Sequence, residues 1–384
     1  MADQLAMAGW RGKAVTIAKP VNAQTVSVEQ RPSFAERPGR LPGLDGLRGL
    51  AAVAVMLFHY TVWLAQLSRT SHQPYGSVLW FPYGIFGVEL FFIISGFVIF
   101  MTLQRRPTLA DFGFARFARL YPAFFVSMVV TTLLIGEPIA SVKVLANLTM
   151  VPAAFGQSQL DGSYWSLMYE LGFYALVALL SILFRWRAPE LPCAVWLMAE
   201  LLVRAVFHGV PLGLLMTATQ TSFAHLFVIG IMLYRLRAGQ ATPLSVPLLM
   251  LSMVMALYGP ASGIGPMFRL EYVGIIAGLS LLVWLATTRV GQFLCVMPLR
   301  FFGRISYPLY LVHQAAGFVL LDRLYVLGLD LNLAVAITMA AAVLLAWVIS
   351  ATIERPAQRW LRARFAMWRD RSVRPAIADG APAA

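Results

Sequence analysis

Two ionisable side chains occur on one apolar stretch of the sequence, at a spacing that could serve chemistry inside a bilayer. His59 follows Arg48 by eleven residues in LRGLAAVAVMLFHY. On a helix this separation is about 20° around the axis and about 16 Å along it, so both side chains share one stripe. Arg48 would lie at the cytoplasmic interface and His59 near mid-membrane, where a histidine either packs against a carbonyl or serves a function.

Two carboxylates occur at comparable depth in other apolar runs. Glu170 lies in SYWSLMYELGFY, about 10 Å into a run that enters from the outside, and Glu89 lies in GIFGVELFFIISGF. A carboxylate bonded to an imidazole fixes its tautomer and raises its basicity, which suits a histidine that takes a proton from a hydroxyl. We therefore expect Glu170 or Glu89 to orient His59. The alternative is a structural hydrogen bond between helices.

A pair of arginines lies close to the cytoplasmic surface. Arg116 and Arg119, three residues apart in the segment 107–119, would project from one face of a short interfacial helix. Two guanidinium groups suit phosphate oxygens, although such pairs also anchor lipid headgroups. Together with His59, they fit a donor whose phosphates stay at the cytoplasmic rim while its reactive group reaches mid-membrane.

The remaining polar residues within apolar runs favour structural roles. Glu200 and Arg204 are four residues apart and can neutralise each other. His225 and His313 also fall in apolar runs. His313 follows Pro308, which we expect to kink its helix and free a carbonyl, so His313 is a second-rank candidate for the site for which a structural role is favoured. The two cysteines show neither a CxxC pattern nor a Cys/His spacing, so no metal site is expected.

Composition determines which elements must position these residues. The chain of 384 residues is 59% hydrophobic and 12% charged, whereas soluble domains carry about 25% charged residues. This balance excludes an ordinary soluble globule and a disordered chain, and it predicts an all-α, polytopic transmembrane bundle of about ten helices. The predicted spans are 47–67, 83–103, 120–137, 163–184, 191–207, 219–236, 243–258, 270–287, 303–325 and 332–353.

The distribution of positive charge predicts the orientation of the bundle. Of the 30 Lys and Arg residues, 25 lie at the two ends of the chain and in alternate loops. The positive-inside rule then puts both termini in the cytoplasm, and this topology explains the net charge of +13 better than a nucleic-acid partner does. We expect a flexible basic cytoplasmic leader at 1–43, a transmembrane domain at 44–356 and a basic cytoplasmic tail at 357–384.

Six stretches, in this order, resemble the acyltransferase 3 family of integral-membrane O-acyltransferases. The resemblance runs from about Leu41 to Pro356, and each stretch by itself is a weak signal. The stretches are LDGLRGLAAVAVMLFH at 44–59, FGVELFFIISGFVI at 86–99, RFARLYP at 116–122, SYWSLMYELGFY at 163–174, ISYPLYLVH at 305–313 and ERP at 354–356.

The resemblance implies an enzyme of about ten helices that takes an acyl group, usually acetyl, from cytosolic acyl-CoA. Arg48 and His59 would match the family's functional pair, Arg116 and Arg119 its donor-binding motif, and Glu170 its acidic residue. The acceptor would be a hydroxyl of a surface, exported or lipid-linked glycan, such as an exopolysaccharide or lipopolysaccharide. The enzyme would then be a multi-pass protein of the inner (cytoplasmic) membrane. We expect the chain to depart from some relatives of the family by its basic leader and by the absence of a C-terminal extracellular hydrolase-like domain.

These inferences give one mechanistic hypothesis and one rival. His59 would act as general base, or carry the acyl group as an acyl-imidazole, with Arg48 and Glu170 completing the catalytic set. We expect Glu89, Ser95, Tyr164 and Trp165 to contact substrate beside Arg116 and Arg119, without a metal. The rival is a translocator of a glycan or lipid intermediate that binds substrate or protons without covalent change.

Overall fold

The structure, a computed structural model, describes residues 41–63, 80–105, 108–184, 188–206, 221–258 and 269–378. These residues belong to one compact unit. Residues 1–40 of the predicted leader and 379–384 of the tail lie outside the described residues, as do parts of the predicted spans 47–67, 191–207 and 219–236.

Every regular element within the described ranges is a helix, which confirms the all-α prediction. Six helical segments of this part are long and apolar enough to cross a bilayer. They are α1 with its π-helical end (Pro42–Phe58 and His59–Trp63), a 3-10 turn with α3 (Pro82–Phe86 and Gly87–Arg105), α4 (Leu109–Ile135), a 3-10 turn with α6 (Gly162–Tyr164 and Trp165–Phe184), α11 (Arg269–Ala286), and α14 with a π-helical turn and α15 (Leu331–Ile349, Ser350–Glu354 and Arg355–Ala378).

Shorter helices occupy the remaining predicted spans. They are α7 (Glu190–Val206), α9 (Ala224–Arg237), α10 (Ser245–Met255), α12 (Met297–Val312) and α13 (Ala315–Val326), and α5 (Val142–Asn147) lies in the loop after α4. The protein is therefore a multi-pass membrane protein. The total of about ten spans and the cytoplasmic position of both termini stay predictions.

The helix that carries Arg116 and Arg119 differs from its prediction. Thr108 caps a single helix, α4, whose 27 residues include both the expected interfacial segment and the following span. The first half of α4 is held by α15, because the ring of Phe114 stacks on that of Phe365 at 4.2 Å. Packing against α15 holds the segment before Pro122, and α4 continues through this proline without a break.

The predicted span 303–325 consists of two helices. Pro308 lies inside α12, and the break occurs later, at His313 and Gln314. The N-terminus of α13 is capped from a distant loop, since Asp161 Oδ2 accepts a hydrogen bond of 2.8 Å from the backbone N–H of Ala315. This contact between distant segments, rather than the proline, determines where the chain changes direction.

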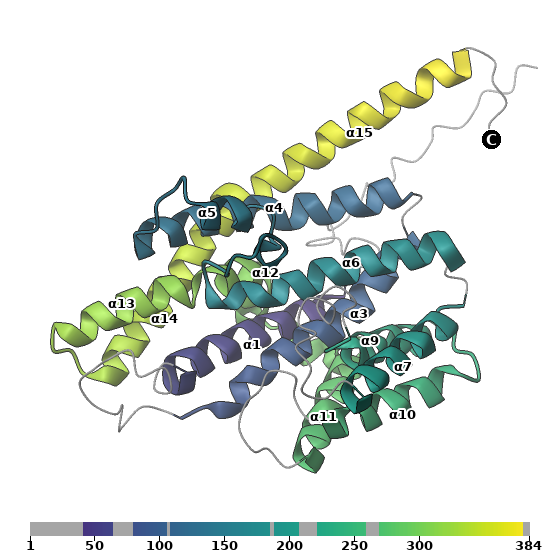
Figure 1. Cartoon of the computed structure of the whole chain (residues 1–384), viewed down its shortest axis with the longest axis horizontal. Helices are drawn as coiled ribbons and strands as arrows, with labels where there is room; N and C mark the ends of the chain where they lie inside the picture. The colour runs from purple at the N-terminus through teal and green to yellow at the C-terminus, as the bar shows by residue number, and fades with distance from the viewer. Residues whose placement is uncertain are drawn as a thin grey trace, which may run out of the picture. The chain divides into compact units, whose positions relative to one another are not determined.

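Close packing of small residues brings the central helices together. α1 contacts α3, α11 and α12, and α3 also contacts α6 and α9. Glycines permit the tightest approach: a Cβ on Gly49 would lie 2.6 Å from the backbone nitrogen of Gly303. In Figure 1, α1 and α3 lie between α6 and the group formed by α7, α9, α10 and α11.

Candidate functional site

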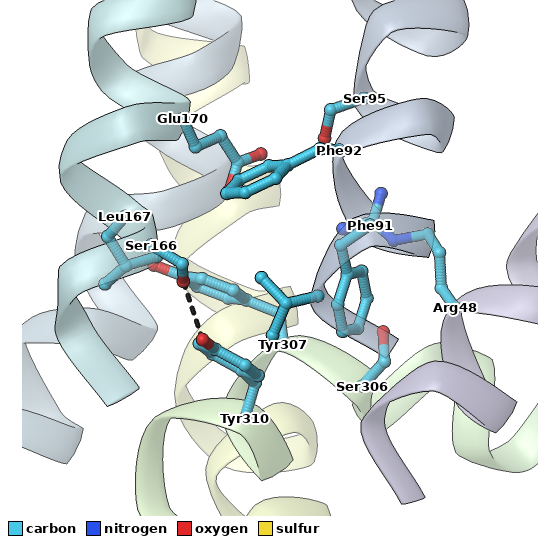
Figure 2. A pocket seen from close by; sticks show the side chains of 11 residues that line it. Arg48, Phe91, Phe92, Ser95, Ser166, Leu167, Glu170, Ser306, Tyr307 and Tyr310 are labelled. Atoms are coloured by element: carbon cyan, nitrogen blue, oxygen red, sulfur yellow. Dashed lines mark hydrogen bonds between the residues drawn. The ribbon is translucent and has the colours of Figure 1, made fainter. Parts of the chain in front are cut away.

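A small pocket lies where α1, α3, α6 and α12 meet. α1 contributes Arg48, α3 contributes Ser95 and α6 contributes Glu170, and aromatic side chains form much of the remaining wall. Figure 2 shows Arg48 and Glu170 entering the pocket from opposite sides, with Ser95 above and between them. Three of the residues predicted for the site thus line one pocket inside an apolar bundle.

Arg48 lies in the part of α1 that packs closely against α12, next to the contact of Gly49 with Gly303. Its Nε atom is buried and has no hydrogen-bond partner within the described ranges. Glu170 lies within electrostatic range of Arg48, yet the described part of the chain contains no ion pair between them. A buried donor without a partner is costly unless a ligand satisfies it, so the guanidinium is available to an anionic or carbonyl-bearing substrate.

The two arginines of α4 connect to the pocket through Tyr174. The Arg116 guanidinium carbon lies 5.9 Å from the centroids of the Phe112 and Tyr174 rings. The Tyr174 hydroxyl in turn donates a hydrogen bond to Glu170. Arg119 interacts electrostatically with Arg48. The predicted pair therefore lies next to the pocket and is coupled to its charged residues.

Glu354 supplies a counter-charge that sequence reasoning did not assign to the site. It is buried, it accepts a 2.8 Å hydrogen bond from Ser350 Oγ, and it interacts electrostatically with Arg119 and Arg48. Gln358 Nε2 also donates to the Arg119 carbonyl at 3.3 Å. The signal that could have revealed Glu354 is its place in ERP, at the end of the resemblance.

The structure corrects the expected partner of His59. Its Nδ1 atom lies 2.8 Å from the carbonyl oxygen of Val55 and 3.1 Å from Nε2 of His313. The expectation that Glu170 or Glu89 bonds to His59 is wrong in this structure. Glu170 instead accepts from Tyr174, one turn later on its own helix, and Glu89 is buried with both carboxylate oxygens unpartnered by any described residue.

His59 is not among the residues that line the pocket, and the rings of Tyr310 and His313 lie between the two. The Tyr310 ring lines the pocket, its centroid is 5.6 Å from that of His313, and the His313 ring is 4.9 Å from that of His59. A sequence of two rings therefore leads from the pocket to His59. Sequence reasoning ranked His313 as a second-rank candidate with a structural role favoured and did not single out Tyr310, although both stand in ISYPLYLVH.

The other predicted residues occupy aromatic surroundings. Tyr164 is buried against Phe124 at 5.2 Å, and Trp165 packs against Phe223 at 5.7 Å, so neither is among the residues lining the pocket. On the pocket wall itself, Ser166 and Tyr310 share a hydrogen bond of 2.7 Å (Figure 2).

The predicted pair of Glu200 and Arg204 is confirmed as an ion pair of 2.9 Å, and Glu200 Oε1 also lies 2.8 Å from His225 Nδ1. This buried group joins α7 to α9, with Arg204 also donating to the carbonyl of Ser222 at 2.7 Å. The charges of Glu200 and Arg204 are paired within the bundle, and no member of the group lines the pocket, which supports the structural interpretation of the pair. Nε2 of His225 is buried without a partner among the described residues.

A helical membrane protein with a polar, arginine-containing pocket inside its bundle is the class that the fold and the site define. A family model described as an acyltransferase domain, that of the acyltransferase 3 family, matches residues 41–351. The chain belongs to this family.

Curated relatives share part of this sequence. The chain is 30% identical to the acyltransferase MdmB of Streptomyces mycarofaciens over 149 residues, and this match covers 35% of the chain and 38% of MdmB. It is 28% identical to the peptidoglycan O-acetyltransferase OatA of Listeria monocytogenes over 171 residues, a match that covers 38% of the chain and 25% of that OatA. It is 29% identical to the O-acetyltransferase OatA of Staphylococcus aureus over 165 residues, a match that covers 37% of the chain and 25% of that OatA. The matched part thus spans less than two fifths of each relative. No solved structure matches the chain significantly.

Proposed function

We propose that this protein is a membrane O-acyltransferase that moves an acyl group, acetyl in the simplest case, from acyl-CoA to a hydroxyl of a glycan or lipid-linked saccharide. The observation that carries the proposal is the pocket in which Arg48 and Glu170 face each other beside the α4 arginines. A polar cavity of this charge inside an apolar bundle is expensive to maintain without a function. Family membership and the names of the relatives support the reaction class.

In this proposal the donor enters from the cytoplasmic side. Coenzyme A carries phosphates, and Arg116 and Arg119 offer guanidinium groups that bind phosphate oxygens through charge-assisted hydrogen bonds. The positive-inside distribution supports a cytoplasmic position for these arginines. Arg48, whose buried Nε has no partner among the described residues, would then orient the acyl end of the donor within the pocket.

His59 would perform the proton transfer. As a general base it takes the proton of the acceptor hydroxyl while the oxygen attacks the thioester carbonyl, so that a C–O bond forms, the C–S bond breaks and coenzyme A leaves as the thiolate. As a nucleophile it would first carry the acyl group as an acyl-imidazole and then pass it to the acceptor. Both routes require substrate to reach His59 past Tyr310, whose ring lies between the pocket and the histidine pair.

The acceptor and the membrane are part of the same proposal. The name of one relative specifies peptidoglycan, which favours a cell-envelope glycan as acceptor, with exopolysaccharide and lipopolysaccharide as further members of that class. An acceptor of this kind implies the inner membrane as the location.

The direct test is acyl transfer by purified protein in lipid, with labelled acetyl-CoA and a candidate glycan. We expect transfer by the wild type and its loss in His59→Ala. A matched control is His225→Gln, which alters a buried histidine outside the pocket. Full activity of a folded His59→Ala protein would remove His59 from the chemistry. In cells, deletion should abolish glycan O-acyl esters while export persists, whereas loss of export with intact esters would favour a translocator.

A further inference from the structure

His313 has a hydrogen-bonding environment that determines where its proton resides. Its ring is fully buried at the end of α12. Nδ1 lies 2.9 Å from the carbonyl oxygen of Tyr310 and 3.2 Å from that of Leu309. A carbonyl oxygen can only accept, so Nδ1 of His313 carries the hydrogen. A neutral imidazole has a single N–H, and Nε2 of His313 is therefore an acceptor.

The same reasoning fixes the tautomer of His59. Its Nδ1 atom faces two acceptors, the carbonyl oxygen of Val55 at 2.8 Å and Nε2 of His313 at 3.1 Å. Nδ1 of His59 thus carries the hydrogen and shares it between them. In the neutral ring this leaves the lone pair on Nε2, which makes no hydrogen bond within the described part of the chain.

The opposite arrangement is disfavoured. If His313 were protonated on both nitrogens, its Nε2 would donate to Nδ1 of His59, and Val55 would lose its donor. The structure would also hold an unpaired cation away from water, which is strongly unfavourable. A neutral pair satisfies every contact without introducing a charge.

Contacts from two distant segments hold His313 in place. The Tyr60 hydroxyl, from the residue after His59, donates to the carbonyl of His313. Ser163 Oγ lies 3.1 Å from the carbonyl oxygen of Tyr310 and donates its hydrogen to Asp161, which also accepts from the N–H of Ala315 at 2.8 Å. The break between α12 and α13 is therefore fixed to both α1 and the loop before α6.

We propose that His313 is the positioning residue of the site: it holds His59 as the Nδ1–H tautomer, so that Nε2 of His59 is the atom that takes the proton or the acyl group. This inference rests on the proposed function. A neutral imidazole performs the orienting role that a carboxylate performs in soluble enzymes, and it does so without a buried negative charge in the membrane.

Two variants of His313 distinguish the loss of the hydrogen-bond acceptor for His59 from the loss of side-chain volume. In His313→Gln, the side-chain Oε1 can take the place of Nε2 and accept from His59, whereas His313→Leu fills the space without an acceptor. We expect His313→Leu to lower kcat for acyl transfer by about 10²-fold at an unchanged KM for acetyl-CoA, and His313→Gln to recover most of that loss. Equal activity of the Leu variant and the wild type, or equal loss in both variants, would overturn the positioning role.

A spectroscopic measurement tests the tautomer without using activity. In protein labelled with ¹⁵N-histidine, the signals that disappear in His59→Ala identify His59 among the five histidines. We expect a protonated Nδ1 and an unprotonated Nε2 in the wild type and in His225→Gln, and a mixture of tautomers in His313→Leu. A protonated Nε2 in the neutral wild-type ring contradicts the inference. If the wild type shows the expected tautomer but transfers no acyl group to any acceptor, the proposed function and the role of His313 in transfer are rejected. The inferred hydrogen bonding of His59 and His313 then still stands.

Discussion

The carboxylate of Asp161 joins two segments that are more than 150 residues apart: Oδ2 accepts from the N–H of Ala315, while Oδ1 accepts from the N–H and the hydroxyl of Ser163, each at 2.7 Å. Asp161 is 1% exposed. One side chain thus caps the start of α13 and the turn that leads into α6. The elements that carry His313 and Glu170 depend on it for their relative position.

We expect Asp161→Ala to destabilise the protein by about 2–4 kcal/mol, because it leaves buried N–H groups without an acceptor. Thermal unfolding in detergent measures the effect. Asp330→Ala is a matched control, since Asp330 caps α14 by accepting a single 3.1 Å hydrogen bond at an exposed position. If Asp161→Ala loses no more stability than Asp330→Ala, the hydrogen bonds of Asp161 that link the two segments contribute little to the stability of the fold.

Gly317 tests the contact between Tyr60 and the His313 turn. A Cβ at this position would lie 2.0 Å from the Tyr60 hydroxyl, so Gly317→Ala must displace the group that donates to the His313 carbonyl. We expect a loss of about 1–3 kcal/mol in stability and a lower kcat for acyl transfer. The matched control is Gly274→Ala in α11, where a Cβ meets nothing within 4 Å.

The second variant in this test is Tyr60→Phe in the Gly317→Ala background. Removing the hydroxyl relieves the closest of three overlaps, because the Cβ would also lie 2.5 Å from Cζ and 2.7 Å from Cε1 of the Tyr60 ring. The double variant should therefore recover part of the stability that Gly317→Ala loses. If the two have the same stability, the overlap with the Tyr60 hydroxyl is not the cause of the loss.

The α4 arginines should determine donor affinity. Each charge-assisted hydrogen bond to phosphate contributes about 1.5–3 kcal/mol, so Arg116→Ala and Arg119→Ala should each weaken coenzyme A binding by about ten- to hundredfold. Calorimetry or a displacement assay with purified protein measures this. Arg300→Ala removes an equal charge from an exposed position of α12 and should leave affinity unchanged. Unchanged affinity in the α4 variants would reject the donor site.

The group formed by Glu200, Arg204 and His225 should affect stability rather than the chemical step. Glu200→Leu leaves a guanidinium that is 13% exposed without its partner, at a cost of about 3–5 kcal/mol. Replacing both Glu200 and Arg204 by Leu should cost less than Glu200→Leu, because no unpaired charge remains. For each variant that folds, kcat should stay near the wild-type value, and a specific loss of kcat would give the group a catalytic role.

Much of the architecture was accessible from the sequence because it follows from local composition. Apolar runs and their lengths predicted the helices, since a backbone in lipid must satisfy its hydrogen bonds within each helix. Arg48, Ser95 and Glu170, singled out by type and position, all line one pocket. The break at His313 and the placement of the first half of α4 were not accessible, because the first depends on Asp161 and the second on packing against α15.

The sequence by itself determined that this protein is an all-helical membrane protein, and it identified which ionisable residues the bundle must accommodate. Only the tertiary structure decided which of them meet. Residue spacing fixes depth along a helix and direction around it, and this suggested a carboxylate as the partner of His59. The identity of the neighbouring helix depends on packing among segments far apart in the chain, and that packing brings His313 of α12, rather than Glu170 or Glu89, to Nδ1 of His59.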